Sequence, residues 1–467
     1  PPPPPPPLFF STHTPQTAML RSLVGSEMCI RDRLLGNTLE EALSLAYKKN
    51  PSIQAKRAEL RSNDELVSIS SSEFFPKIRF IGSYGESVTN YKEADEIRLR
   101  PNVAKIEAEQ IIFSGGRLVN NRSQSLNIVA ASRADLEILE QEILFSAAEA
   151  FFNVLTNEKI VELREVNLDV LNERLEVAKI QFEVGELTLT DVAQSEARLS
   201  LSQANLAEAR SNLEKSKAIY RSIIGVIPVN LSNNTINLSL PMTIEDAISI
   251  ANVKSPYLKF AEKSELSSRF AVKSAKARLL PSFSLRGEFS NSEEMLFNAD
   301  GDAYQLMGVV SMPIFSGGLN WSNIRKAQEI NIRDKFQLIE AKRFVNQEVK
   351  SAFAQYNSSL IKVNSSKKQF EANQIALEGV KEEFELGTRT NLDVLDAEQE
   401  FLDSQVSMIS SENNSKLSMF YLLLSIGSLS PEELSLPISK YDPNENYNKV
   451  KNIKLGWKRF KDIKNLD

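Results

Sequence analysis

Apolar residues recur every seven positions over two long stretches of the chain. The first series is Val161, Leu168, Leu175 and Phe182, and the second is Val363, Phe370, Leu377 and Phe384. A seven-residue period predicts helices that wind around one another along a continuous seam. Residues 317–386 also contain no proline, so they predict a single helix of about 105 Å at about 1.5 Å per residue.

Other stretches alternate strictly between apolar and polar residues. In 282–289 the positions of Phe283, Leu285 and Phe289 alternate with serine, arginine and glutamate. This period predicts strands with one apolar and one polar face, and we expect such strands within about 76–113 and 281–315. Two interpretations remain open: a membrane wall with lipid on one side and water on the other, or a soluble sheet covered on one face. The long helices favour the wall, because a globular domain has no use for them.

The chain is one unit written twice. The segment "TLEEALSLAYKKNP" at 38–51 returns as "TIEDAISIANVKSP" at 243–256, and "IFSGG" at 112–116 returns at 314–318. Each copy opens with a threonine followed by an acidic residue, the signature of a helix N-terminus. We therefore divide the body into a first repeat at 34–230, a second repeat at 231–428, and a tail at 429–467.

The opening segment, residues 1–33, begins with seven prolines and has no helical or strand period. It resembles translated sequencing adapter, and we exclude it from fold reasoning; a genuine disordered proline-rich tail is the alternative. The chain's one cysteine and one histidine, Cys29 and His13, both lie in it. The body therefore offers no Ser-His-Asp or Cys-His nucleophile and no site for a metal held by histidine or cysteine. We expect no metal and no cofactor.

Charge is nearly balanced, with 55 basic and 61 acidic residues and a net charge of −6. This composition gives no basic footprint for nucleic acid. No stretch reaches the roughly 18 apolar residues of a membrane-spanning helix.

At this point the chain resembles the TolC family of outer-membrane channel proteins, over about residues 38–428. The resemblance rests on the duplication, on "FSGG" at both strand-to-helix junctions, on "AFFNVL" at 150–155 and "VGELTLTDV" at 184–192, and above all on "GTRTNLDVLDAEQ" at 387–399. It implies a mainly α fold with a membrane β-barrel portion. Three copies would share one 12-stranded barrel and one tunnel of long helical hairpins through the periplasm.

The resemblance also implies roles for residues near the two glycine breaks. Asp393 and Asp396 match a carboxylate ring that filters cations at the closed entrance. Arg389 matches a latch to the neighbouring hairpin, with Thr190 and Asp191 as its partners. The family has a tyrosine where this chain has Phe384, so one hydroxyl link is lost. From the residues alone, helix capping together with a solvated face is the favoured interpretation of these aspartates in an isolated helix.

Two further groups of residues have expected roles. The tips of the hairpins, where a periplasmic adaptor would dock by resemblance, comprise Val184, Gly185, Leu386 and Gly387. The strand-to-helix junctions, which we expect to turn the chain with close packing, comprise Phe113, Gly115, Gly116, Phe315, Gly317 and Gly318.

The sequence thus predicts a passive exit duct, not an enzyme, in the outer membrane and periplasm of a Gram-negative bacterium. Its expected partners are two further copies of itself, outer-membrane lipid, a periplasmic adaptor, and an inner-membrane transporter of the ABC or proton-driven type. A soluble coiled-coil scaffold with a small sheet is the main alternative. A hydrolase using Asp393 and Asp396 would need a concave pocket, which adjacent turns of one rod do not offer. The sequence does not indicate the cargo.

Overall fold

The protein was analysed as a computed structural model that describes residues 37–90, 92, 96–232, 239–295 and 300–451. The first repeat comprises α1 (Leu39–Lys49), α2 (Pro51–Ser72), β1 (Lys77–Tyr84), β2 (Ser87–Thr89), β3 (Ile97–Leu99), β4 (Asn102–Phe113), α3 (Arg117–Glu183) and α4 (Leu189–Ile224). The second comprises α5 (Ile244–Lys254), α6 (Pro256–Ala277), β5 (Ser282–Glu293), β6 (Gly301–Ser311), α7 (Leu319–Glu385) and α8 (Asn391–Ser425), before α9 (Glu445–Val450). The segment 1–33 lies outside the described residues.

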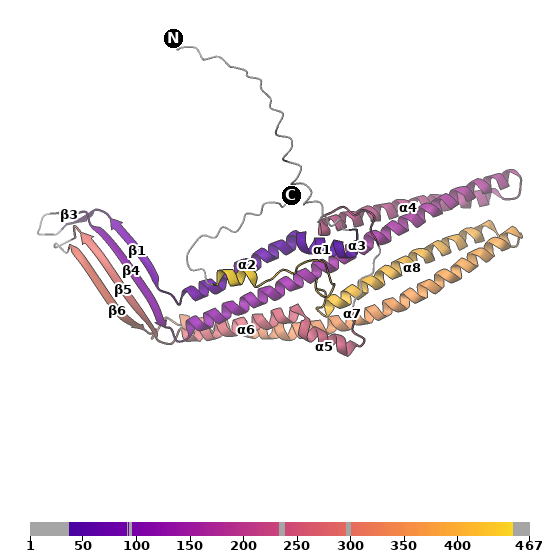
Figure 1. The fold of residues 1–467 in the computed structure, drawn as a ribbon. Coiled ribbons are helices and arrows are strands. Elements are labelled where there is room, and N and C mark those ends of the chain that lie inside the picture. The colour runs from indigo at the N-terminus through magenta and orange to yellow at the C-terminus, as the bar shows by residue number, and fades with distance from the viewer. Residues whose placement is uncertain (1–36, 91, 93–95, 233–238, 296–299, 452–467) are drawn as a thin grey trace, which may run out of the picture.

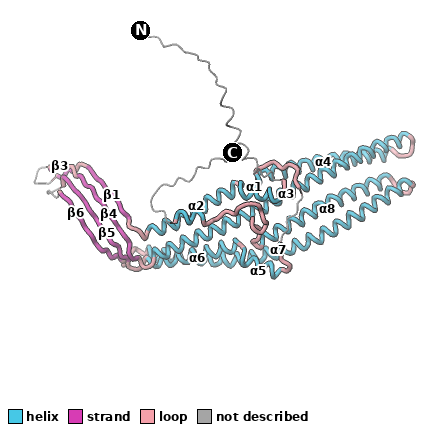
Figure 2. The backbone as a smooth tube through the Cα atoms, viewed as in Figure 1, coloured by secondary structure: helices cyan, strands magenta, loops and turns pink. Residues whose placement is uncertain are grey.

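The molecule is elongated, with the sheet at one end and two helical hairpins at the other (Figures 1 and 2). The hairpins are α3 with α4 and α7 with α8. Each of α3 and α7 has 67 residues, which makes it about 100 Å long at about 1.5 Å per residue. Between residues 37 and 451, no described helix combines the length and the apolar character needed to cross a membrane.

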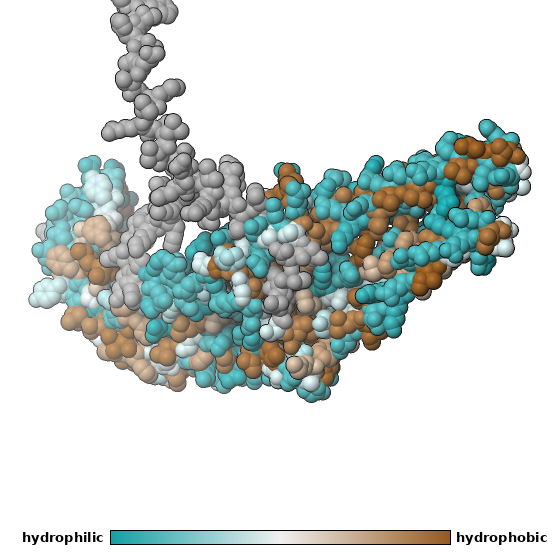
Figure 3. Space-filling model, turned by 45° about the vertical axis from the view of Figure 1, so that its right-hand side comes forward, coloured by the Kyte–Doolittle hydropathy of each residue, from teal (hydrophilic) through white to brown (hydrophobic). Residues whose placement is uncertain are grey.

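The seven-residue period marks the seam within each hairpin, as predicted. Leu175 of α3 and Leu377 of α7 are buried, as are Leu206 and Tyr220 of α4. Next to the turn of the first hairpin, the last residue of the seven-residue series is no longer buried: Phe182 is 42% exposed. Apolar side chains also remain visible on the outside of both hairpins (Figure 3). The single chain therefore leaves apolar helix surface uncovered.

Both repeats contribute to one hydrophobic core in the middle of the molecule. Its largest fully buried side chains are Tyr47 of α1, Phe151 of α3, Tyr220 of α4 and Phe420 of α8. Phe152 and Phe420 lie 5.9 Å apart between ring centroids, so the two repeats pack directly against one another. The repeats are therefore not independent domains in the sense of separate cores.

The sheet has four antiparallel strands in the order β1-β4-β5-β6. Its register aligns Phe80, Ile106, Phe289 and Tyr304 in one row across all four strands. The opposite face carries charged residues: Lys105 forms ion pairs with Glu107 at 2.6 Å and with Glu288 at 2.9 Å, and Arg79 pairs with Glu107 at 2.7 Å. The predicted apolar and polar faces are thus real.

Neither face of the sheet is covered by the part of the chain that the structure describes. Tyr304 is 89% exposed and Phe80 is 69% exposed on the apolar face. The outer strands β1 and β6 each pair on one side only among the described residues. Strand β5 continues to Glu293, which pairs with Asn102 of β4.

The strand-to-helix junctions turn through glycines with positive φ, as expected for Gly115, Gly116, Gly317 and Gly318. At Gly115 the need for glycine is also steric. A Cβ there would lie 2.6 Å from the Cβ of Leu280, and φ is +60°. Among the described residues nothing lies within 4 Å of a Cβ built at Gly317, so this steric requirement applies at the first junction only. Phe113 and Phe315, the aromatic residues of the two motifs, are 55% and 88% exposed.

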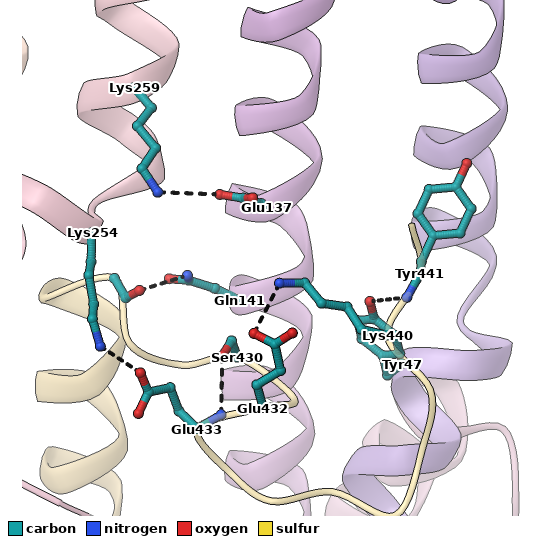
Figure 4. Close-up of polar contacts among 11 residues, drawn as sticks. Tyr47, Glu137, Gln141, Lys254, Lys259, Ser430, Glu432, Glu433, Lys440 and Tyr441 are labelled. Atoms are coloured by element: carbon teal, nitrogen blue, oxygen red, sulfur yellow. Dashed lines mark hydrogen bonds and ion pairs between the residues drawn. The ribbon is translucent and has the colours of Figure 1, made fainter. Parts of the chain in front are cut away.

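The segment after α8 runs across the middle of the molecule (Figure 1), and polar contacts bind it back to the helices (Figure 4). Lys254 pairs with Glu433 at 2.5 Å, and the backbone N–H of Tyr441 donates to the hydroxyl of Tyr47 at 3.3 Å. Further along, Asn446 donates to the carboxylate of Asp64 at 2.8 Å. The tail is therefore fastened to α1, α2 and α5 by polar contacts.

Tips of the helical hairpins as the candidate functional site

Each hairpin reverses direction at a glycine, as the sequence predicted. Gly185 and Gly387 have φ of +84° and +76°, a conformation that favours glycine. The N–H of Gly185 donates to Phe182 at 3.0 Å, and that of Gly387 donates to Phe384 at 2.9 Å, which closes each helix end. The flanking side chains point into solvent, with Val184 68% exposed and Leu386 80% exposed.

A capping box begins the returning helix of each hairpin. In α4, Asp191 accepts hydrogen bonds from the N–H of Thr188 at 2.9 Å and from its hydroxyl at 2.6 Å. In α8, Asp393 accepts from the N–H of Thr390 at 2.8 Å and from its hydroxyl at 2.7 Å. The Thr390 N–H is the largest cause that lowers the pKa of Asp393, and the Thr188 hydroxyl does the same for Asp191. Both carboxylates are thus held ionised at fixed positions.

The two predicted ring aspartates have different surroundings. The carboxylate of Asp393 accepts the hydrogen bonds of the capping box. Asp396, one turn further along α8, instead forms an ion pair with Arg198 of α4. The side chain of Asp396 is still 53% exposed. The structure therefore places both carboxylates near the tip, but it pairs one of them with a cation from the other hairpin of the same chain.

The predicted latch residue Arg389 lies in the turn between α7 and α8. Its Nε donates to the carboxylate of Glu383 at 2.7 Å, a contact within the same hairpin. The carboxylate of Asp191 instead accepts from Thr188, and Thr190 is exposed. Among the described residues Arg389 therefore pairs with Glu383 and not with Thr190 or Asp191, and its predicted link to the neighbouring hairpin stays a prediction. Phe384 is half-buried near the end of α7.

Sequence reasoning missed the contacts that join the two hairpins within the chain. Besides Arg198 with Asp396, Arg174 of α3 pairs with Glu398 of α8 at 2.8 Å, and Glu398 is buried. The amide of Asn391 donates to the hydroxyl of Ser195 at 3.2 Å. A comparison of the repeats offers a signal, since the position equivalent to Arg198 holds a glutamate.

No group of histidine, cysteine, aspartate or glutamate side chains that could hold a metal ion occurs among the described residues. Asp393 and Asp396 lie on one side of a single helix, and their nearest polar partners are a threonine and an arginine. The arrangement supplies fixed negative charge and breakable links between helices. It does not supply a second group opposed to these carboxylates across a concave pocket.

Comparison with known proteins gives one consistent result. A family model described as "Outer membrane efflux protein" matches residues 42–226 and 247–428. The outer membrane efflux protein BepC of Brucella suis is 30% identical over 429 residues, covering 90% of this chain and 92% of BepC. The outer membrane protein TolC of Escherichia coli is 24% identical, covering 85% of this chain and 83% of TolC.

A solved structure is also similar. The CmeC outer membrane channel of Campylobacter jejuni superposes with a TM-score of 0.77 at 16% identity, covering 89% of each chain. At this identity the similarity concerns the fold. The fold class expected from the sequence, long helical hairpins joined to a small four-stranded sheet, is confirmed.

Proposed function

The chain belongs to the outer membrane efflux protein family, and we propose on this premise that three copies form one continuous exit duct. The protein is an outer-membrane channel of a Gram-negative bacterium that serves efflux or type I secretion. The duct consists of a barrel in the outer membrane and a helical tunnel that extends into the periplasm. The proposal assigns it no covalent chemistry, in keeping with a family of channel proteins.

The observation that carries this proposal is the sheet. One face is apolar and exposed, the other is charged, and the outer strands β1 and β6 each have a free edge in the described chain. In lipid every strand edge must be paired, so such a sheet has to close into a barrel. Three copies of four strands give 3 × 4 = 12 strands if β6 of one copy pairs with β1 of the next. The apolar row would then face lipid and the charged face would line water.

The hairpin tips supply the gate in this proposal. If the first turn of α8 faces the tunnel axis, the three copies contribute six carboxylates from Asp393 and Asp396 to one ring, which filters cations. Arg389 would exchange its partner Glu383 for Thr190 and Asp191 of the neighbouring copy when the tips close. Opening would then require a shift between two packed states of the helix tips.

The duct works with other proteins, because a channel in the outer membrane has no energy source of its own. Members of this family are components of tripartite systems, which implies an adaptor and an inner-membrane transporter. We further propose that the adaptor docks on the exposed tip residues Val184, Gly185, Leu386 and Gly387. The transporter is either of the ABC or of the proton-driven type.

Fractionation followed by reconstitution tests the proposal. The protein should be extracted from outer membranes with detergent, migrate as a trimer, and insert into planar lipid bilayers as a conducting pore. A soluble coiled-coil scaffold would instead stay in the soluble fraction and give no conductance. Recovery of a water-soluble monomer would reject the channel.

A further inference from the structure

A polar cavity of about 420 Å³ lies at the opposite end of α3 from its hairpin turn, where the sheet meets α3 and α6 (Figure 1). Three arginines and several serines line it, among them Arg117, Arg278, Arg286, Ser114, Ser282 and Ser284. Glu109 is the only acidic residue of this lining in the described part of the chain. The cavity therefore combines three positive charges with one negative charge.

The cavity lies on the charged face of the sheet. Along β4, Glu109 stands two positions from Glu107. Along β5, Arg286 stands two positions from Glu288, and the register places Arg286 opposite Glu109. Side chains two positions apart point to the same face of a strand, so the cavity shares the face that carries the ion pairs of Lys105. This is the face that lines water if the sheet closes into the proposed barrel.

Carboxylates of the chain hold these arginines weakly or not at all. Arg286 pairs with Glu109 at 3.3 Å, and both side chains are close to half exposed. Arg117 pairs with Glu73 at 3.0 Å. Arg278 is exposed at the end of α6 and forms no ion pair with any residue that the structure describes. Because ion pairs open to water contribute little stability, these guanidiniums can exchange their partners for an incoming anion.

A comparison of the two repeats shows that the strand-to-helix turn does not need these arginines. Both junctions turn through glycines with positive φ. The repeats align with an offset of 205 residues through the first strand and 202 residues from the glycine motif onward. None of the three arginines has a basic equivalent, and the aligned pairs are Arg117 with Leu319, Arg278 with Glu73, and Arg286 with Ile81. The turn itself therefore does not account for the basic cavity.

We propose that this cavity is an anion-binding subsite on the inner wall of the duct, which takes cargo that carries neighbouring carboxylate or phosphate groups. A guanidinium binds either group through two parallel hydrogen bonds. The volume lies within the roughly 300–1,000 Å³ of small-molecule sites. The cavity is built within one chain, and only its position on the inner wall rests on the barrel proposed above.

Glu109 keeps binding at this subsite reversible. An incoming anion must displace the Glu109 carboxylate from Arg286 and remain beside its charge, whereas Arg278 is open to the anion at once. A conduit needs binding that is favourable enough to admit the cargo and weak enough to release it. Removal of the Glu109 charge should therefore strengthen anion binding, while removal of the arginine charges should weaken it.

Citrate, with three carboxylates, and inorganic phosphate are the probes that test the subsite. Isothermal titration of the detergent-purified protein measures binding, and planar bilayers measure block of the current with the probe on the barrel side. Arg278→Gln with Arg286→Gln should raise the dissociation constant and the half-blocking concentration at least about tenfold, because it removes two charged hydrogen-bond donors. Glu109→Gln should lower both values.

Arg98→Gln is the control that matches Arg278→Gln in charge. Arg98 pairs with Glu96 and belongs to β3, at the far end of the sheet from the helices (Figure 1). Its loss removes one positive charge outside the cavity, so it should change either value less than about twofold in buffered salt. Arg278→Gln alone breaks no ion pair among the described residues, and it should weaken binding in the same direction as the double variant.

Two outcomes would overturn the inference: neither probe binds to the wild-type protein, or the double variant binds both probes as tightly as the wild type. Binding of citrate alone, or of phosphate as well, supports the subsite and defines which groups it accepts. Binding without conductance in any preparation would reject the duct and retain the anion site of the chain. Conductance without binding would reject the subsite and leave the duct standing.

Discussion

Asp393 and Thr390 hold each other at the first turn of α8 by reciprocal hydrogen bonds. The Asp393 carboxylate accepts from the N–H and the hydroxyl of Thr390 at 2.8 and 2.7 Å, and the Thr390 hydroxyl accepts from the N–H of Asp393 at 3.3 Å. Helix capping and a charged ring are therefore compatible roles, because a capping carboxylate remains ionised and rigidly placed. Capping is thus present in the structure, and the charged ring stays a prediction that capping does not oppose.

The pH dependence of cation block follows from this arrangement. The pKa of Asp393 lies below its ordinary value of 3.8, because the Thr390 N–H stabilises the ionised form. Its charge and the stability that the cap contributes are present above that value and are lost as the pH falls through the lowered pKa. Block of the channel by multivalent cations should therefore be constant between about pH 7 and pH 5 and weaken only below about pH 4. A titration of block in planar bilayers, with Asp393→Asn as control, measures this; a midpoint above pH 5 would contradict it.

Removal of the carboxylate charges of Asp393 and Asp396 should reduce cation selectivity, and the two residues should contribute unequally. Asp393→Asn with Asp396→Asn together should shift the reversal potential in a salt gradient toward that of an unselective pore. Alone, Asp396→Asn should have the smaller effect, because Arg198 already offsets its charge. Arg198→Gln should make the pore more cation-selective, since it frees the Asp396 charge. If the double variant keeps the wild-type selectivity, no aspartate ring lines the entrance.

Substitution of Arg389 should loosen the closed tip. Arg389→Ser removes the only proposed cationic link between copies, so the basal conductance should rise. Arg389→Lys keeps the charge without the planar fork that carboxylates bind, and should give an intermediate conductance. Glu383→Gln is the matched control: it removes the partner at 2.7 Å within the same hairpin and should leave the basal conductance low. Wild-type conductance in Arg389→Ser would show that Arg389 is not a latch.

Much of the fold could be predicted from the sequence because it depends on local periodicity. The seven-residue series marks the buried seam at Leu175 and Leu377, and the glycines at 185 and 387 mark the turns. The two-residue period at Phe283 and Leu285 identifies a strand whose faces differ. In each case the residues that form the pattern lie close in sequence to the residue whose structure they predict, within a few helical turns or one strand.

The contacts between hairpins could not be predicted in this way. Arg198 and Asp396 stand 198 positions apart, and their pairing depends on the rotation of two long rods about their own axes. The heptad pattern defines which face of a helix packs against the other helix of its own hairpin. It does not define which residues of the second hairpin that helix contacts. The same holds for Arg57, whose surroundings come from α1, α3 and the tail.

The tail after α8 should stabilise the middle of the molecule through Arg57. The guanidinium lies between the rings of Tyr47 and Tyr441, 4.6 and 4.7 Å from their centroids. It also pairs with the buried carboxylate of Glu140 at 2.9 Å. Burial raises the pKa of Glu140, so this carboxylate depends on its partner. Arg57→Ala should lower the free energy of unfolding by about 3–5 kcal/mol, because it leaves a buried charge unpaired.

Two companion variants separate charge from packing at this site. Arg57→Met with Glu140→Leu removes both charges and keeps side-chain volume, so it should recover most of the stability lost in Arg57→Ala. Tyr441→Ala leaves the ion pair intact and removes one stacked ring, which should cost about 0.5–2 kcal/mol. Thermal unfolding of the detergent-solubilised protein, followed by circular dichroism, ranks the variants. If Arg57→Ala unfolds at the wild-type temperature, the guanidinium does not join the tail to the helices energetically, and α1–α3 must hold their positions through the apolar core alone.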